Sequence, residues 1–107
     1  MRSESPAKLL RFHLSEYDRD HGRPLYETIV EKCRELKIAG ATVFRGLEGY
    51  GETAAMHRGG LMRHDQPIVI AVIDSPEAIA RLAPVVEAMM GTGVMAVSDV
   101  VAVRVQK

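Results

Sequence analysis

The sequence predicts an α+β sandwich in which two helices cover one face of a four-stranded antiparallel sheet. Apolar residues alternate with polar ones in short segments, and in two longer segments they recur every three to four residues. The segments follow the order strand, helix, strand, strand, helix, strand. The length of 107 residues corresponds to one domain, with its core expected at about residues 7–105.

The first strand and the first helix are expected at residues 8–14 and 24–40. Residues 15–23, between them, are polar and predict a linker. Pro24 suits the first turn of a helix, and Gly40 is the expected left-handed cap at its end. The half-buried face of the strand consists of Leu10, Phe12 and Leu14. The apolar stripe of the helix consists of Leu25, Ile29, Cys33 and Leu36.

The remaining strands are expected at residues 41 to about 47, 68–73 and 97–105. Either Asp74 or Ser75 can cap the second helix, and Pro84 inside it is expected to bend it. A glycine-containing turn ends this helix before the last strand. The apolar stripe of the second helix consists of Ile79, Leu82, Val86 and Met89.

Two split β-α-β units with right-handed crossovers give a ferredoxin-like β-α-β-β-α-β sandwich, with both helices on one face of the sheet. The other face would expose valine and isoleucine side chains from the third and fourth strands. A large apolar patch on a monomer usually marks an interface. We therefore expect a homo-oligomer that buries these sheet faces against one another.

A loop of 22 residues, Arg45 to Gln66, separates the second and third strands. It holds five glycines and three arginines and shows no sustained strand or helix period. Most connections in compact domains run to about 4–6 residues, so a loop this long is expected to bind something. This pattern favours a sensor or regulator over an enzyme with a buried catalytic cleft.

Charge and cysteine content limit the classes of partner and compartment. Fourteen basic residues balance fourteen acidic ones, which argues against nucleic-acid or anionic-membrane binding. Cys33 is the single cysteine, so a reducing, cytoplasmic location is expected. The longest apolar run, residues 68–73, is far shorter than the roughly 20 residues that cross a bilayer, so no membrane insertion is expected.

Several blocks of the sequence resemble one family. They lie at residues 8–11, 21–27, 39–46, 49–51, 67–70 and 82–87, and they include His-Gly-Arg-Pro-Leu-Tyr-Glu and Ala-Gly-Ala-Thr-Val-Phe-Arg-Gly. Over about residues 7–105 the chain resembles the PII-like family catalogued as domain of unknown function 190. The resemblance implies a trimer related to the PII nitrogen-regulatory signalling proteins. It also implies small anionic ligands, typically adenine nucleotides, in clefts between subunits, and a long loop that engages partners such as membrane transporters. Members of the family are associated with fluoride-export systems.

The chain departs from the PII signalling proteins at two positions. Their glycine-rich turn before the last strand carries a phosphate-binding lysine, whereas residues 91–95 here contain none. Their mobile loop has a modifiable tyrosine near its tip, whereas Tyr50 stands at the base of the loop here.

Glycines and arginines supply the candidate ligand site. Backbone N–H groups at glycines can form an anion-binding nest, and a guanidinium can bind phosphate or carboxylate in a bidentate manner. On this basis the expected ligand-binding residues are Arg45, Gly46, Gly49, Gly51, Gly91, Thr92, Gly93 and Arg104. The alternatives are structural: a bulged strand end and loop root at residues 45–51, a helix cap at Gly91, and an edge-strand charge at Arg104.

The loop offers a docking surface for a partner protein. Its expected contact residues are Glu52, Met56, His57, Arg58, Arg63 and His64. His57 and His64, with Met56 and Met62, could instead bind copper. Glu48 and Glu52 could form an acid/base pair, although no nucleophile stands near them in the sequence.

The leading hypothesis is therefore a cytoplasmic, homotrimeric, non-enzymatic regulator that binds a small anionic metabolite, such as an adenine nucleotide, and needs no cofactor or metal. In this hypothesis Arg45, Gly49 and Gly51 hold the anion on one subunit, and residues 91–93 with Arg104 hold it on the neighbour. The runner-up is a metal-tolerance trimer of the same fold, and the third alternative is a small hydrolase or isomerase.

Overall fold

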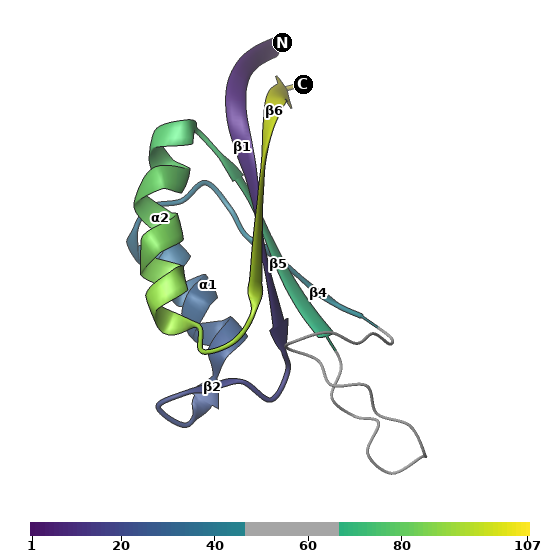
Figure 1. Ribbon diagram of the computed structural model, residues 1–107. Coiled ribbons are helices and arrows are strands. Elements are labelled where there is room, and N and C mark those ends of the chain that lie inside the picture. Colours follow the sequence, from purple (N-terminus) through teal and green to yellow (C-terminus); the bar gives the residue numbers. More distant parts are fainter. Residues whose placement is uncertain (47–66) are drawn as a thin grey trace.

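The computed structural model describes residues 1–46 and 67–107. Its strands and helices follow the order β1(Arg2–Ser15), β2(Arg19–Asp20), β3(Arg23–Pro24), α1(Leu25–Glu35), β4(Thr42–Arg45), β5(Pro67–Asp74), α2(Pro76–Met89) and β6(Val94–Val105). The main sheet has the strand order β4-β5-β1-β6, and every neighbouring pair in it is antiparallel. Both helices lie on one face of this sheet (Figure 1). The predicted ferredoxin-like sandwich is confirmed.

The core lies between this face and the two helices. Each strand turns alternate side chains toward the helices, so Leu10, Phe12 and Leu14 of β1 are fully buried. The helical period does the same for both predicted stripes, although Leu36 and Met89 at the stripe ends are only partly buried. The remaining core side chains are Leu25, Ile29, Cys33, Ile38, Ile68, Ile70, Val72, Ala78, Ile79, Leu82 and Val86.

Helix α1 ends earlier than predicted, because Gly40 is not its cap. The left-handed position is Lys37, with φ of 60°. Its N–H donates to the Arg34 carbonyl at 3.1 Å, and the Ile38 N–H donates to the Cys33 carbonyl at 3.0 Å. This pair of bonds is a Schellman motif, which satisfies the last carbonyls while Ile38 packs into the core.

The two alternatives for the start of α2 are resolved in favour of Ser75. Its hydroxyl accepts a hydrogen bond from the Ala78 N–H at 3.1 Å, and Pro76 occupies the first helical turn. Asp74 has another role, because its carboxylate accepts the Ala39 N–H at 2.9 Å and the Ser75 N–H at 2.7 Å. Asp74 thus ties the segment before β4 to the start of α2.

The predicted linker at residues 15–23 is wrong in part, because it contains the small hairpin β2–β3. His21 and Gly22, its two turn residues, have φ of 51° and 85°. Positive φ at both central positions is the signature of a type I′ turn, which matches the twist of the flanking strands. The guanidinium of Arg23 then binds the Glu31 carboxylate of α1 in a fork, with N–O distances of 3.0 and 2.5 Å.

Strands β1 and β6 are both longer than predicted. Only Lys8–Ser15 of β1 pair with β5, whereas β6 pairs with β1 from His13 back to Arg2. Residues 2–7 and 100–105 therefore form a two-stranded ribbon beyond the four-stranded sheet, and this ribbon extends past the helices (Figure 1).

Candidate functional site

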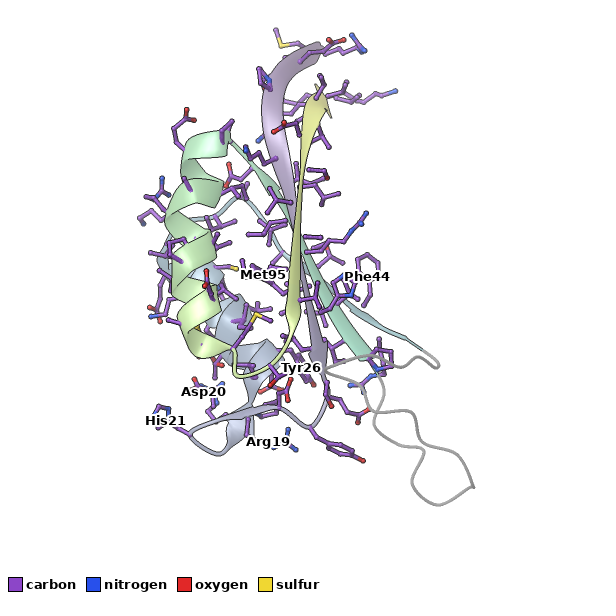
Figure 2. All side chains as sticks on the ribbon, in the orientation of Figure 1. Arg19, Asp20, His21, Tyr26, Phe44 and Met95 are labelled. Atoms are coloured by element: carbon purple, nitrogen blue, oxygen red, sulfur yellow. The ribbon has the colours of Figure 1, made fainter. Side chains whose placement is uncertain are left out.

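The candidate site lies on the face of the sheet that the helices leave uncovered. Residues directly opposite each other in the register share a face, so Phe44 and Val69 project together, away from the helices. Figure 2 shows this difference: Met95 points toward the helices, and Phe44 points to the opposite side. Phe44 is 55% exposed and Ile73 is 50% exposed. The predicted exposure of apolar side chains from the third predicted strand is thus present for Ile73, and Phe44 adds an exposed aromatic ring from the second.

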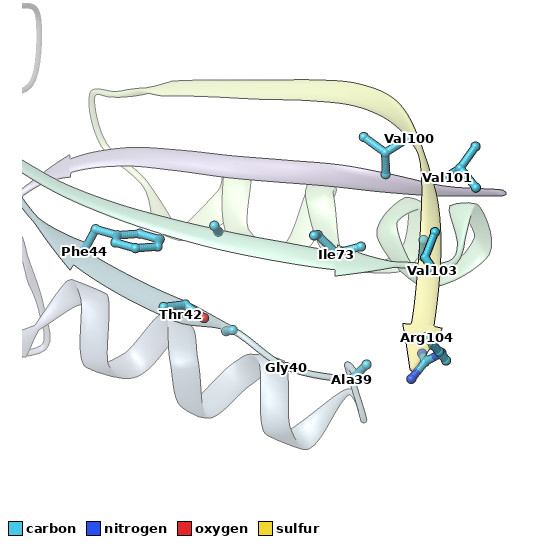
Figure 3. A pocket seen from close by; sticks show the side chains of 12 residues that line it. Ala39, Gly40, Thr42, Phe44, Ile73, Val100, Val101, Val103 and Arg104 are labelled. Atoms are coloured by element: carbon cyan, nitrogen blue, oxygen red, sulfur yellow. The ribbon is translucent and has the colours of Figure 1, made fainter. Parts of the chain in front are cut away.

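A hollow of about 730 Å³ lies on this face, between the start of β4 and the end of β6. Figure 3 shows the end of β6 bending toward the segment of Ala39 and Gly40, with Arg104 beside it. The hollow is lined by Ala39, Gly40, Ala41, Thr42, Phe44, Ala71, Ile73, Val100, Val101, Ala102, Val103 and Arg104.

Two contacts fix the walls of this hollow. The Ala39 N–H donates to Asp74, which holds the residue 39–42 wall against the start of α2. Arg104 lies opposite Ser3 in the register, so the pairing of β6 with β1 holds the other wall. The hollow is thus built by backbone pairing and one carboxylate.

The chemistry of the hollow is apolar with one cation. Among the described residues that line it, Arg104 is the one charged side chain. Its guanidinium forms no ion pair within the described part of the chain. Ligand sites typically combine apolar walls with a few polar groups that orient the ligand. This arrangement can bind a flat apolar ring that carries an anionic group.

Gly91, Thr92 and Gly93 lie at the other end of β6 from Arg104. A strand rises about 3.3 Å per residue, so the 12 residues of β6 separate the two groups by roughly 35 Å. One subunit cannot present both to the same small anion, and the predicted grouping of these residues on one neighbour is therefore corrected.

Gly91 and Gly93 line a separate hollow of about 380 Å³, together with Glu87, Met90 and Met95. A carboxylate and two thioethers supply no donors for an anion. The side chains of this hollow therefore do not add to the anion-binding nest that the glycines predict.

Arg45 and Gly46 have structural contacts in addition to their predicted ligand role. Arg45 lies opposite the buried Ile68 in the register and so is on the helix side of the sheet, where it donates to Glu16 at 2.9 Å. The Gly46 N–H donates to the Pro67 carbonyl at 2.8 Å. A Cβ at position 46 would lie 2.6 Å from Cγ of Pro67, so this close approach requires glycine.

The other predicted residues lie outside the described part of the chain. They are Glu48, Gly49, Gly51, Glu52, Met56, His57, Arg58, Met62, Arg63 and His64. The described residues contain no group of three or more His, Cys, Asp or Glu side chains that could hold a metal ion. Cys33 is buried as expected, and burial raises the pKa of its thiol. No helix formed by the described residues is long and apolar enough to span a membrane.

The residue-based site prediction missed the wall formed by Ala39, Gly40, Ala41 and Thr42. These residues are small, carry no charge and have no motif that marks a ligand site. Their role depends on the bend of β6 toward them, which brings Arg104 close to residues that lie more than 60 positions earlier in the sequence.

Comparison with known proteins identifies the family. The family described as DUF190, Uncharacterized ACR, matches residues 7–102. A UPF0166 protein of Aquifex aeolicus is 40% identical over 76 residues, which cover 69% of this chain and 72% of the relative. A UPF0166 protein of Methanocaldococcus jannaschii is 30% identical over 95 residues, which cover 87% and 88% of the two chains.

Solved structures with the same fold are PII-like proteins. CPII from Thiomonas intermedia K12, solved with ADP and bicarbonate, has a TM-score of 0.63 at 23% identity and covers 94% of this chain and 91% of its own. Its apo form, a nitrogen regulatory PII-like protein, has a TM-score of 0.62 at 20% identity, with 97% and 99% coverage. A further CPII structure, with ADP, AMP and bicarbonate, has a TM-score of 0.64 at 24% identity, with 94% and 91% coverage. The chain therefore belongs to the DUF190 family and has the ferredoxin-like fold of the PII-like proteins.

Proposed function

We propose that this protein is a PII-like signalling protein. In this proposal a homotrimer binds a small anionic metabolite, with an adenine nucleotide as the leading candidate, between its subunits. Its long loop then regulates a partner such as a membrane transporter. The protein carries no catalytic role in this proposal and acts in the cytoplasm.

The observation that carries the proposal is the apolar hollow with Arg104 at its rim. The aromatic ring of Phe44 and the branched side chain of Ile73 suit the flat face of a purine base. The Arg104 guanidinium suits a phosphate, because its planar donors match two phosphate oxygens. Gly40 has open space where a Cβ would stand, so its backbone is accessible to a ligand.

The two ends of the sheet motivate a composite site between subunits. Gly46, where β4 ends, and Gly93, just before β6 begins, belong to the same end of the sheet, whereas Arg104 and Thr42 belong to the other end. When the uncovered faces of two copies pack together, one end of one copy can meet the other end of its neighbour. The ligand would then be held by residues 45–51 and 91–93 of one subunit and by the Arg104 hollow of the next.

The relatives support the ligand class at the level of the fold. CPII has been solved with ADP, AMP and bicarbonate. Each of these ligands carries negative charge, and two of them carry an adenine ring, so they match the combination of an apolar hollow with one arginine.

Isothermal titration calorimetry with ADP, AMP and ATP tests the ligand part of the proposal. At least one nucleotide is expected to bind, and Arg104→Gln is expected to weaken it about tenfold or more, because charge-assisted hydrogen bonds are lost. The control is Arg34→Gln, which removes an exposed arginine from α1, away from the hollow. If none of the three nucleotides binds at millimolar concentration, the proposal that the ligand is an adenine nucleotide is wrong.

Capture of membrane proteins from native membranes tests the partner part. The full chain is the bait, and a variant that lacks residues 53–64 is the matched control. A partner retained by the full chain and lost with the deletion supports the loop as the contact. Equal retention by both baits contradicts it.

A further inference from the structure

A second hollow, of about 340 Å³, adjoins the hollow of the candidate site. The two share the lining residues Ile73, Ala102 and Arg104, so the Arg104 side chain stands where they meet. The other residues that line the second hollow are Ser5, Pro6, Ala7, Asp74, Ser75, Pro76 and Glu77. We call it the acidic hollow, because it contains two carboxylates. A ligand group bound by Arg104 is therefore next to both hollows.

Asp74 and Glu77 supply the negative charge of the acidic hollow. The Asp74 carboxylate is fixed, because it accepts the Ala39 N–H at 2.9 Å and the Ser75 N–H at 2.7 Å. Glu77 lies in the first turn of α2, where the helix dipole stabilises negative charge. Neither carboxylate forms an ion pair within the described residues. Both charges therefore act on any ligand group that enters this hollow.

The N-terminus of α2 does not offset this negative charge. Helix N-termini often bind phosphate through their free N–H groups. Here Pro76, in the first turn, has no N–H. The Ser75 N–H donates to Asp74, and the Ala78 N–H donates to the Ser75 hydroxyl at 3.1 Å. Groups of the chain itself thus occupy the donors that would otherwise attract a phosphate.

Arg104 is the one basic side chain among the described residues that line either hollow. Its guanidinium can bind one phosphate or carboxylate in a bidentate manner. A further phosphate that reached the acidic hollow would be repelled by the like charges of the two carboxylates. Carboxylates accept hydrogen bonds, so the acidic hollow suits hydroxyl or amino groups of a ligand instead.

The residues proposed to complete the site from a neighbouring copy add little positive charge. Residues 91–93 contain no lysine or arginine, and the hollow beside them holds the Glu87 carboxylate. Arg45 donates to Glu16 at 2.9 Å, and this carboxylate offsets its charge. The described part of the composite site therefore offers no cluster of cations to a polyphosphate chain.

We propose that the site takes a ligand with a single anionic group, a nucleoside monophosphate, and that Asp74 and Glu77 discriminate against di- and triphosphates. The inference rests on the proposed function, because it names the class of nucleotide that binds the same site. In this arrangement the base lies in the apolar hollow, Arg104 binds the one phosphate, and the acidic hollow excludes any further phosphate.

Isothermal titration calorimetry with AMP, ADP and ATP measures this discrimination. A chelator removes magnesium, because a bound cation would mask the phosphate charge. AMP is expected to bind at least about tenfold more tightly than ATP, with ADP between them, because each added phosphate increases the repulsion. The difference is expected to shrink as the salt concentration rises, because salt screens the carboxylates.

Glu77→Gln removes one carboxylate and keeps the shape of the side chain. It is expected to strengthen ATP binding about threefold or more and to change AMP binding less, so that the preference for AMP narrows. The control is Glu35→Gln on α1, which changes the net charge equally at a position that lines neither hollow. Both positions are exposed, so both variants should fold normally, with unchanged far-ultraviolet circular dichroism.

The inference is overturned if ATP binds as tightly as AMP, if Glu77→Gln leaves the preference unchanged, or if Glu35→Gln narrows it equally. A preference that does not respond to salt would also overturn it, because the discrimination would then depend on shape and not on charge. In each of these cases a nucleotide still binds, so the proposed function stands. If none of the three nucleotides binds, the adenine nucleotide of the proposed function is wrong, and so is this inference.

Discussion

The two phenylalanines of the chain lie on opposite faces of one sheet. Phe12, on β1, faces the helices and is fully buried, whereas Phe44, on β4, faces away from them and is 55% exposed. The covered face has a continuous core in which nine large side chains of the described residues are less than 2% exposed. The uncovered face has exposed apolar residues and a hollow, and Arg104 is the one charged side chain among the described residues that line this hollow.

The helix-covered face stabilises the subunit, whereas the uncovered face is available to bind other molecules. Burial of apolar area is the main favourable term in folding, so the helix-covered face accounts for most of the subunit's stability. The uncovered face and the ribbon contribute little to the isolated subunit. Substitutions on the covered face are therefore expected to lower the free energy of unfolding more than substitutions on the uncovered face.

Phe12→Ala, on the covered face, is expected to have the largest effect on stability. It removes a fully buried aromatic side chain and leaves a cavity, so the free energy of unfolding is expected to fall by about 3–5 kcal/mol. Phe44→Ala is the matched control, with an expected loss of about 1 kcal/mol or less in the dissociated subunit. Urea denaturation at several protein concentrations measures both.

The concentration dependence sharpens this comparison. If copies cover the uncovered face, the cost of Phe44→Ala grows with protein concentration, while that of Phe12→Ala does not. Equal losses for the two variants in the dissociated subunit would contradict the proposed division between the faces.

Gly46→Ala compares the two ends of β4. A Cβ at position 46 would stand 2.6 Å from the Pro67 ring, so the strands must shift and the free energy of unfolding is expected to fall by about 1–3 kcal/mol. Gly40→Ala, before the other end of the strand, meets nothing within 4 Å and is expected to stay within about 0.5 kcal/mol of wild type. Thermal unfolding of both variants measures this difference. If Gly46→Ala unfolds at the same temperature as wild type, the close approach of residue 46 to Pro67 is contradicted.

Ser75→Ala compares the helix layer with the sheet edge. The Ser75 hydroxyl caps α2, so its loss is expected to cost about 1 kcal/mol in chemical denaturation. Ser98→Ala, at an exposed position of β6, removes the same hydroxyl and is expected to change stability by about 0.5 kcal/mol or less. A larger effect at Ser98 than at Ser75 would show that the edge strand contributes more to subunit stability than the burial pattern indicates.

The sequence was sufficient for the parts of the fold that depend on local periodicity. The stripes of both helices and the buried face of β1 follow directly from apolar spacing, and so does the order of the elements. The strand formed by Arg2 to Pro6 could not be predicted, because its residues are mostly polar and β6 holds them in place. Lys37 in the left-handed position was also missed, since glycine at position 40 gave the stronger cap signal.

The candidate site depends on contacts between residues distant in the sequence. Arg104 was predicted from its charge, but the wall opposite it consists of small residues without a motif. Arg45 was predicted as a ligand-binding residue, and its contact with Glu16, 29 residues away, could not be read from the sequence. Residue type can therefore identify a charged side chain as a candidate for ligand binding. Which residues surround that side chain depends on the strand register.

Loss of the ion pair between Arg23 and Glu31 is expected to have the smallest effect on the free energy of unfolding. Both side chains are about half exposed, so water screens the pair. The hydrogen bond from Arg23 lowers the pKa of Glu31 below its usual value. A lowered pKa in the folded state stabilises the fold at neutral pH, and this contribution disappears as the pH falls through the usual carboxylate range to the lowered pKa. The difference in stability between wild type and Glu31→Gln should therefore be largest near pH 7, shrink toward pH 3 and weaken in salt. Glu87→Gln, whose carboxylate forms no ion pair among the described residues, is the control. A pH-independent difference for Glu31→Gln would mean that the hairpin β2–β3 is held to α1 by packing, as the covered face is, and not by charge.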